Sequence, residues 1–245
     1  EKCVHACELG VDGVILEPYA AANAVLSEDE KTLGVCLIDI GAGTTDVALY
    51  VHGALRYTEI IPIGGDHVTN DIAQVLRTPL LEAEQLKIKQ GCAQSIAVKR
   101  EEYIHFPTTS GKELRKLERH FLASIIEARY AELFAHIHKQ LEDLGALDYL
   151  SAGFVLTGGA ARIEGAEALA DSIFGKDKTR LGTPNIRPEL GGQLVQSSVY
   201  ATSVGLLIAG RDKMLEELEK QPTKRKGINT EGFLAKFRAW LERNF

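Results

Sequence analysis

The segment from Asp39 to Asp46, with the sequence DIGAGTTD, constrains the fold more than any other part of the chain. It lies between two apolar segments, 33–40 and 45–51, which we expect to form buried strands. The turn Gly41-Ala42-Gly43 between them predicts a tight hairpin that needs positive φ. Glycines also let backbone N–H groups approach a ligand closely, and several such donors together suit a phosphate. A simple glycine hairpin with a polar tip is the alternative interpretation.

Side chains near this turn extend the phosphate chemistry. Thr44 and Thr45 supply hydroxyl donors. Asp39, at the end of the first strand, is placed to hold a water bound to Mg²⁺, so we expect no direct protein ligand for the metal. Glu17 follows a short apolar segment, 14–16, which we expect to be a strand. A carboxylate there is placed to orient an attacking water.

A second strand, 154–156, also ends in a glycine turn. Gly158 and Gly159 would let the backbone approach a flat base, and Arg162 would stack on it. Glu84 and Lys87 lie three residues apart, and therefore on one face, in the polar helix expected at 81–90. Such a pair can hold ribose hydroxyls, although it is more often a surface ion pair.

The other segments alternate between strands, glycine turns and helices, which is typical of an α/β protein with one main sheet. The clearest helix is 122–144, because its apolar residues recur at three- and four-residue spacings. We also expect a strand over 55–63, an exposed extended segment over 96–106, and helices over 19–26, 65–76, 163–174 and 199–209.

Composition and charge exclude several classes of protein. The chain has 245 residues, of which 45% are hydrophobic and 25% charged, as in globular proteins. No apolar run approaches the ~20 residues that span a bilayer. The net charge of −6 argues against nucleic-acid binding. The four cysteines form no C-x-x-C pair and are expected to be reduced thiols of a cytosolic protein.

The end of the chain differs in character from the rest. Residues 211–231 are polar and predict a flexible linker, and 232–245 predict an amphipathic helix. Its apolar side chains cover roughly 140° of the helix, with basic residues beside them. This pattern predicts a helix that binds anionic membrane lipid, and packing on the protein's own core is the alternative. The residues concerned are Phe233, Leu234, Lys236, Phe237, Arg238, Trp240, Leu241, Arg243 and Phe245.

Together these motifs resemble the actin/Hsp70/sugar-kinase superfamily, and within it the FtsA family of bacterial cell-division proteins. Residues 39–46 resemble its second phosphate loop, and 157–162 its adenosine motif. Glu17-Pro18-Tyr19-Ala20-Ala21 resembles a Glu-Pro-x-Ala-Ala segment that helps to position water and Mg²⁺, and Gly64-Gly65 resembles a glycine pair near the phosphates. The stretches that most resemble FtsA are 64–73, 86–93, 127–130, 155–165 and the C-terminal helix.

The resemblance implies an α/β fold: an actin-like (ribonuclease H-like) ATPase lobe with a mixed sheet, flanking helices, a smaller inserted α/β subdomain and the C-terminal amphipathic helix. The main subdomain would comprise 1–77 and 151–210, and the inserted one 78–150. ATP and Mg²⁺ are the implied cofactors, with Glu17 and Asp39 as catalytic residues. The implied cofactor-binding residues are Gly41, Ala42, Gly43, Thr44, Thr45, Gly65, Glu84, Lys87, Gly158, Gly159 and Arg162.

The chain has one D-x-G-x-G-T segment, whereas a complete member of this superfamily has a phosphate loop in each of two halves. The chain also begins at Glu1 and not at a methionine. We therefore expect a carboxy-terminal lobe without the first phosphate loop. Such a lobe would bind nucleotide poorly and be at most a weak ATPase.

The implied function is that of a structural adaptor. It would polymerise into an actin-like filament and anchor FtsZ to the cytoplasmic face of the bacterial inner membrane at the division septum. Residues 78–150 would bind the FtsZ C-terminal tail, with Arg129 as the first candidate and Arg119 as the second. Later division proteins are further expected partners, and nucleic acid is not. The alternatives are a sugar or acetate kinase, an Hsp70-type chaperone, and a rod-shape or pilus-assembly actin homologue.

Overall fold

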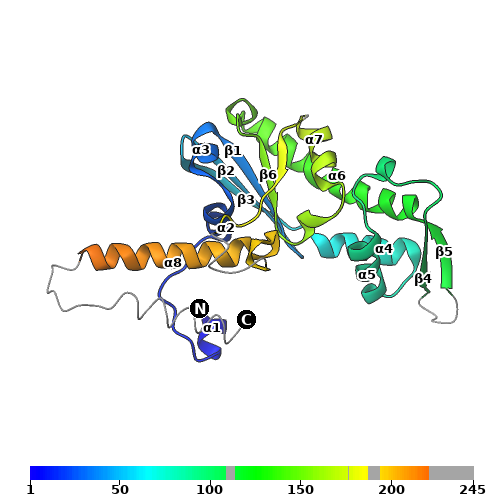
Figure 1. The fold of residues 1–245 in the computed structure, drawn as a ribbon, viewed down its shortest axis with the longest axis horizontal. Coiled ribbons are helices and arrows are strands. Elements are labelled where there is room, and N and C mark those ends of the chain that lie inside the picture. Colours follow the sequence, from blue (N-terminus) through cyan, green and yellow to red (C-terminus); the bar gives the residue numbers. More distant parts are fainter. Residues whose placement is uncertain (109–113, 176, 187–193, 221–245) are drawn as a thin grey trace. The chain divides into compact units, whose positions relative to one another are not determined.

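A five-stranded sheet forms the centre of residues 1–209, and its strand order is β3-β2-β1-β6-β7 (Figure 1). The computed structural model describes residues 1–108, 114–175, 177–186 and 194–220. Strands β1 (Val35–Ile40), β2 (Thr45–Val51) and β3 (Ala54–Ile61) are antiparallel neighbours. Strands β6 (Phe154–Thr157) and β7 (Thr179–Leu181) run parallel to β1. The sheet is therefore mixed, and β1 and β6 end at the same edge.

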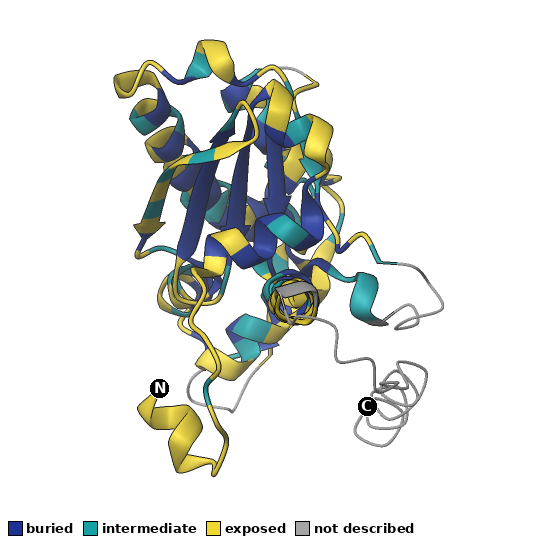
Figure 2. Ribbon diagram, turned by 90° about the vertical axis from the view of Figure 1, so that its left-hand side faces the viewer, coloured by how far each residue is buried: buried dark blue, intermediate teal, exposed yellow. Residues whose placement is uncertain are grey.

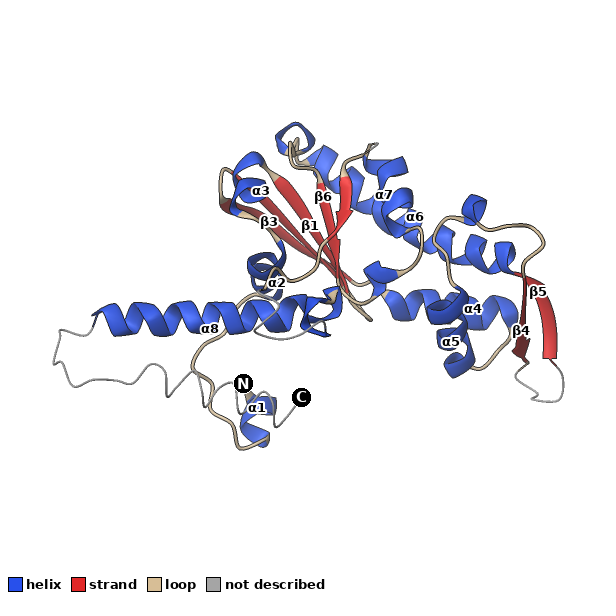
Figure 3. Cartoon of the chain, in the orientation of Figure 1, coloured by secondary structure: helices blue, strands red, loops and turns tan. Residues whose placement is uncertain are grey.

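Helices and a small hairpin complete the described chain (Figure 3). The hairpin consists of β4 (Tyr103–Pro107) and β5 (Leu114–Glu118). The helices are α1 (Lys2–Ala6), α2 (Glu17–Val25), α3 (Glu28–Leu33), α4 (Gly65–Leu76), α5 (Leu80–Gln90), α6 (Arg119–Asp143), α7 (Ala166–Phe174) and α8 (Ala201–Lys220). Short 3₁₀ turns lie at Ser95–Ala97, Leu147–Tyr149, Ala160–Arg162, Leu194–Gln196 and Ser198–Tyr200.

Both faces of the sheet are covered, which explains why all of β1 is buried (Figure 2). Successive strand residues point to opposite faces. Ile38 and Ile40 pack in a core with residues of α4, α5, α6 and α7, whereas Val35 and Leu37 pack in a second core with α2 and the start of α8. Near-continuous apolar strands such as β1 are typical of sheets with helices on both faces.

Most of the expected elements are confirmed, but two were predicted wrongly and one helix was missed. Segment 14–16 lies outside any strand, and Val14 and Leu16 are exposed. Segment 96–106 is extended only from Tyr103, and Ile104 and Phe106 are buried against the core. The polar helix α3 was not expected.

The predicted linker and tail are only partly described. Helix α8 continues to Lys220, so residues 211–220 are helical and not a flexible linker. Residues 221–245, with all nine predicted membrane-binding residues, lie outside the described part. Among the described residues, no helix combines the length and hydrophobicity needed to cross a bilayer.

The inserted subdomain proposed for 78–150 stays a prediction. Ile126 and Phe134 of α6 belong to the same hydrophobic core as Ile38 of β1 and Leu156 of β6. The hydrophobic core of the sheet therefore extends into residues 78–150, and α6 packs directly on the sheet.

Candidate functional site

The predicted phosphate loop is the exposed turn that joins β1 to β2. It is closed by a hydrogen bond from the Gly41 N–H to the Thr44 carbonyl oxygen (2.9 Å). The strand register places Asp39 opposite Asp46. Neither Gly41 nor Gly43 has a positive φ, so that expectation is wrong. The backbone conformation of this turn is therefore one that residues other than glycine can also adopt. Ala42, Gly43 and Thr44 form the exposed tip of the turn.

The start of α4 supports this loop from behind. The N–H groups of Gly65 and Asp66 donate to the carbonyl oxygens of Gly41 (3.0 Å) and Ala42 (2.8 Å). The Thr45 hydroxyl donates to the carbonyl oxygen of Ile63 (2.8 Å). The Gly65 N–H and the Thr45 hydroxyl, both expected at a cofactor, therefore bond to the protein itself. They hold the loop in place and leave its tip to meet a ligand.

Three carboxylates lie close together where β1 ends and this loop starts. Asp39 and Asp46 are buried, and Glu17 lies exposed at the start of α2. Burial raises the pKa of Asp39 to about 6; a hydrogen bond from Thr202 opposes this rise, and the negative charges of Glu17 and Asp46 add to it. Burial and Glu17 also raise the pKa of Asp46, against a hydrogen bond from Thr44.

This concentration of carboxylates suits a divalent cation. Within the described residues, no three His, Cys, Asp or Glu side chains are arranged to bind a metal directly. A cation here would therefore keep several waters and share them with Asp39, which is the usual behaviour of Mg²⁺ beside phosphates. The donor set fits the cofactor expected from the sequence.

The second glycine turn lies beside the first because β6 is parallel to β1. Thr157 is in register with Asp39, and Gly158 follows with a φ of +90°. A Cβ atom on Gly158 would lie 2.4 Å from both Asp39 Oδ1 and the Ile40 carbonyl oxygen. Only glycine therefore fits at this position.

The rest of the adenosine motif lies on the same turn. Around Gly159 there is more room, because a Cβ atom there would come no closer than 3.9 Å to a neighbour, Val199. Arg162 is exposed at the end of the 3₁₀ turn. The hydroxyl of Tyr130 donates to the Ala160 carbonyl oxygen (2.7 Å) and so ties this turn to α6.

The predicted ribose pair, Glu84 and Lys87, forms a bonded network on α5. Lys87 Nζ lies 2.7 Å from Glu84 Oε2 and donates to the Thr69 hydroxyl (2.8 Å) and the Gly65 carbonyl oxygen (2.9 Å). Glu84 also accepts a hydrogen bond from Thr69. Burial raises the pKa of Glu84, but the bonds from Lys87 and Thr69 outweigh it and leave the pKa below its usual value. Lys87 therefore braces α5 against the start of α4, and the half-exposed Glu84 is the member placed to meet a ribose.

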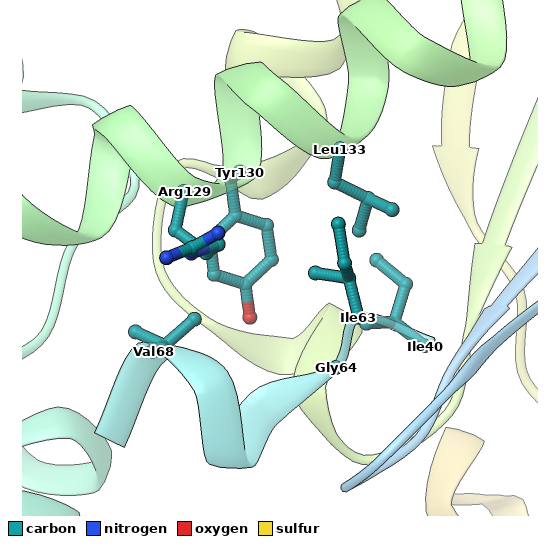
Figure 4. Close-up of a pocket in the computed structure, with 7 residues that line it drawn as sticks. All are labelled: Ile40, Ile63, Gly64, Val68, Arg129, Tyr130 and Leu133. Carbon is teal, nitrogen blue, oxygen red and sulfur yellow. The ribbon is translucent and has the colours of Figure 1, made fainter. Parts of the chain in front are cut away.

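A small cavity lies behind the loop, between β1, α4 and α6 (Figure 4). Its volume of about 10 Å³ would hold about one water molecule. It is too small for a nucleotide, which would have to bind on the outer side of the loop. The lining residues are Ile40, Ile63, Gly64, Val68, Arg129, Tyr130 and Leu133.

Arg129, the first candidate for partner binding, is engaged within the protein. Its Nε and Nη2 atoms bind the two carboxylate oxygens of Asp71 on α4 (2.7 and 2.9 Å), and Nη1 binds Glu132 (2.6 Å). These hydrogen bonds raise the pKa of Arg129, against a smaller effect of burial. The side chain thus joins α6 to α4, and a partner would share it with Asp71 or displace Asp71.

Arg119, the second candidate, is engaged in the same way at the start of α6. It binds Glu102 (2.9 Å) and Glu164 and donates to the carbonyl oxygen of Gln90 (2.9 Å). These contacts connect segments that are distant in the sequence. We therefore interpret Arg119 as a structural junction.

The sequence patterns predicted no role for two residues of this site, Asp46 and Thr202. Asp46 closes the DIGAGTTD segment, and the antiparallel register of a hairpin would have placed it opposite Asp39. Thr202 donates to Asp39 Oδ2 (3.2 Å) from 163 positions away, and no local pattern indicated this.

The fold and these two glycine turns define the class: the chain has an actin-like ATPase fold. MreB5 of Spiroplasma citri bound to ADP superposes with a TM-score of 0.69 at 21% identity, over 88% of this chain and 65% of that one. A PilM-PilN type IV pilus biogenesis complex gives a TM-score of 0.64 at 18% identity, over 85% and 56%. At these identities the likeness concerns the fold alone.

The sequence comparisons then give the family. The family model described as "Cell division protein FtsA" matches residues 36–205, and the chain belongs to the FtsA family. Cell division protein FtsA of Pseudomonas aeruginosa is 43% identical over 248 residues, and that of Escherichia coli K12 is 39% identical over 254. Each alignment covers 100% of this chain and 59% of the relative, so the chain spans about three fifths of those relatives.

Proposed function

We propose that this chain acts in bacterial cell division as the nucleotide-binding lobe of an actin-like adaptor that polymerises and anchors FtsZ to the cytoplasmic face of the membrane at the septum. The observation that carries the nucleotide part is a convergence at one edge of the sheet. There the β1–β2 turn, the β6 turn and the carboxylates of Glu17, Asp39 and Asp46 lie together. The similar MreB5 structure was solved with ADP, which supports a nucleotide as the ligand of this fold.

Each group at this edge has a role in the proposal. The tip formed by Ala42, Gly43 and Thr44 holds phosphate oxygens through backbone N–H donors. Gly158, Gly159 and Arg162 receive the base, and Glu84 receives the ribose. Asp39 would hold magnesium through a water molecule, and Glu17 would orient the attacking water. Magnesium, when bound, neutralises phosphate charge. Hydrolysis by this lobe is at most weak.

The proposed partner surface lies on α6 and α4, around Arg129. An acidic and hydrophobic peptide, such as the FtsZ C-terminal tail, would find a guanidinium there beside exposed parts of both helices. We expect Arg129→Glu to weaken binding of a fluorescently labelled FtsZ tail peptide at least tenfold, because it places a carboxylate where the peptide needs a cation. Unchanged affinity in fluorescence anisotropy would remove Arg129 from the site.

A second variant separates direct contact from positioning. Asp71→Asn keeps the charge of Arg129 but weakens the bidentate pair that joins α6 to α4. If Asp71→Asn binds the peptide as well as the wild type, Arg129 contacts the peptide itself. If both variants lose binding, the pair positions the two helices and the surface they share is the site. The peptide affinity of Arg119→Gln is measured for comparison, since we interpret Arg119 as a structural residue that does not contact the peptide.

The membrane part of the proposal rests on residues 232–245, whose sequence pattern is that of an interfacial helix. Localisation to the septal membrane, filament formation and contacts with later division proteins belong to the same proposal.

A further inference from the structure

The start of α8 and the turn after β6 both approach the carboxylate of Asp39. Its Oδ2 atom accepts a hydrogen bond from the hydroxyl of Thr202, with a distance of 3.2 Å. Its Oδ1 atom lies against Gly158, where any side chain would clash, at 2.4 Å from the position of a Cβ atom. Thr202 lies at the start of α8, and Gly158 lies in the turn that follows β6.

The start of α8 is fixed beside this site by the 3₁₀ turn that precedes it and by α2. The hydroxyl of Ser198 donates to the carbonyl oxygen of Gly158 (2.9 Å). One turn after Thr202, a Cβ atom on Gly205 would lie 1.7 Å from the carbonyl oxygen of Ala20, so the backbones of α8 and α2 touch there. Helix α2 also carries Glu17. The position of Thr202 is therefore set against both β6 and α2.

The surroundings of Asp39 otherwise disfavour its anion. Asp39 is buried, and the charged groups that affect it are the carboxylates of Glu17 on α2 and Asp46 on β2. In the part of the chain that the structure describes, Thr202 gives the one side-chain hydrogen bond to this carboxylate. A hydroxyl donor stabilises the charged form and fixes the plane of the carboxylate.

We propose that Thr202 is a positioning residue. It would orient the Asp39 carboxylate toward a water molecule bound to the magnesium ion that accompanies a nucleotide. Because Thr202 acts through Asp39, its hydroxyl need not touch the ligand. This inference rests on the proposed nucleotide function, and it adds a residue that no motif in the sequence marks.

The first test uses the 245-residue chain without any ligand. The ¹³C resonance of the Asp39 carboxyl group is followed against pH in the wild type and in Thr202→Val, which keeps the shape but removes the donor. We expect the Asp39 midpoint, about 6 in the wild type, to rise in Thr202→Val. The expected rise is roughly half a unit to one unit. Thr202→Ser restores the donor and should restore the midpoint, and Thr58→Val, on the exposed face of β3, should leave it unchanged.

A midpoint in Thr202→Val equal to that of the wild type, with a folded amide spectrum, would overturn the proposal. Thr202→Ala replaces the valine variant if the latter does not fold. Failure of Thr202→Ser to restore the midpoint would also overturn it, because the effect would then come from packing and not from the hydroxyl.

The second test adds ATP with Mg²⁺, or with EDTA, and follows the amide resonances of 41–45. We expect Thr202→Val to weaken ATP binding roughly threefold to tenfold with Mg²⁺ and to leave it unchanged in EDTA. An equal loss in both conditions would contradict positioning toward magnesium. If the wild type itself shows no response to ATP, the proposed nucleotide function fails. The ligand-free titration still decides whether Thr202 controls Asp39.

Discussion

At the scale of single residues, Asp39 shows how this site costs folding free energy. The carboxylate is buried beside Glu17 and Asp46, and its pKa in the folded protein is about 6, against a usual value of 3.8. As the pH rises, the unfolded chain therefore loses this proton first. The free energy of unfolding falls between about pH 4 and pH 6, and the loss persists at higher pH.

Asp39→Asn should remove this cost. We expect the variant to have a free energy of unfolding higher than the wild type by about 1–3 kcal/mol at pH 7.5, and within about 1 kcal/mol of it at pH 4, where Asp39 is still neutral in the folded protein. Urea denaturation at the two pH values measures the difference. A variant that is less stable at pH 7.5, or a difference that does not change with pH, would contradict this account.

The same scale shows how far the sequence predicts a site. The DIGAGTTD turn, the second glycine turn and Asp39 were found because glycines and carboxylates at strand ends leave a local pattern. The roles of Thr45, Gly65 and Lys87 were harder to predict, because their hydrogen bonds go to other protein groups. Spacing indicates the face on which a side chain lies, but a partner such as Thr202 depends on tertiary packing.

At the scale of elements, apolar patterns predicted β1, β2, β3 and α6 well, because the strands bury apolar side chains beneath the helices and α6 buries its apolar face against the sheet. Segment 14–16 is apolar enough for a strand, but no strand pairs with it among the described residues. Helix α3 was missed because it is polar. Its capping box, in which Ser27 and Glu30 bond each other's backbone N–H groups, was the local signal that could have revealed it.

The crossing of α2 and α8 gives a prediction at this scale. A Cβ atom on Gly205 would collide with the Ala20 carbonyl oxygen, whereas one on Gly210, further along α8, would meet nothing within 4 Å. Gly205→Ala should lower the free energy of unfolding by about 2–4 kcal/mol, because the two backbones must separate. Gly210→Ala should raise it by about 0.5–1 kcal/mol, since alanine favours a helix over glycine. Thermal and urea unfolding measure both, and equal stability of the two variants would refute the close crossing.

At the scale of the whole molecule, charge separates the end of the chain from the rest. Residues 224–245 carry a net charge of +4, and the other residues carry −10. An acidic protein with a basic, aromatic end is suited to bind an anionic surface through that end alone. The chain also spans 59% of the length of its curated relatives. The adaptor function proposed here is therefore that of a protein of the relatives' full length, of which this chain would be one part.

The membrane prediction belongs to this scale. We expect the chain to sediment with anionic liposomes, and Phe237→Glu combined with Trp240→Glu to abolish sedimentation, because two aromatic side chains that would enter the lipid become charged. Trp240→Phe keeps a bulky aromatic and should retain binding. Sedimentation of the double variant at the wild-type level would show that the tail is not the anchor.

The most direct test of the central claim is an NMR titration of the ¹⁵N-labelled chain with ATP and Mg²⁺. If the edge of the sheet formed by β1, β2 and β6 is the nucleotide site, the amide shifts will concentrate at 41–45 and 157–162. The affinity will be weaker than low-micromolar, because Mg-ATP needs groups from two lobes around its phosphates. The absence of shifts in both segments at millimolar ATP, or shifts confined to other parts of the chain, would contradict the account.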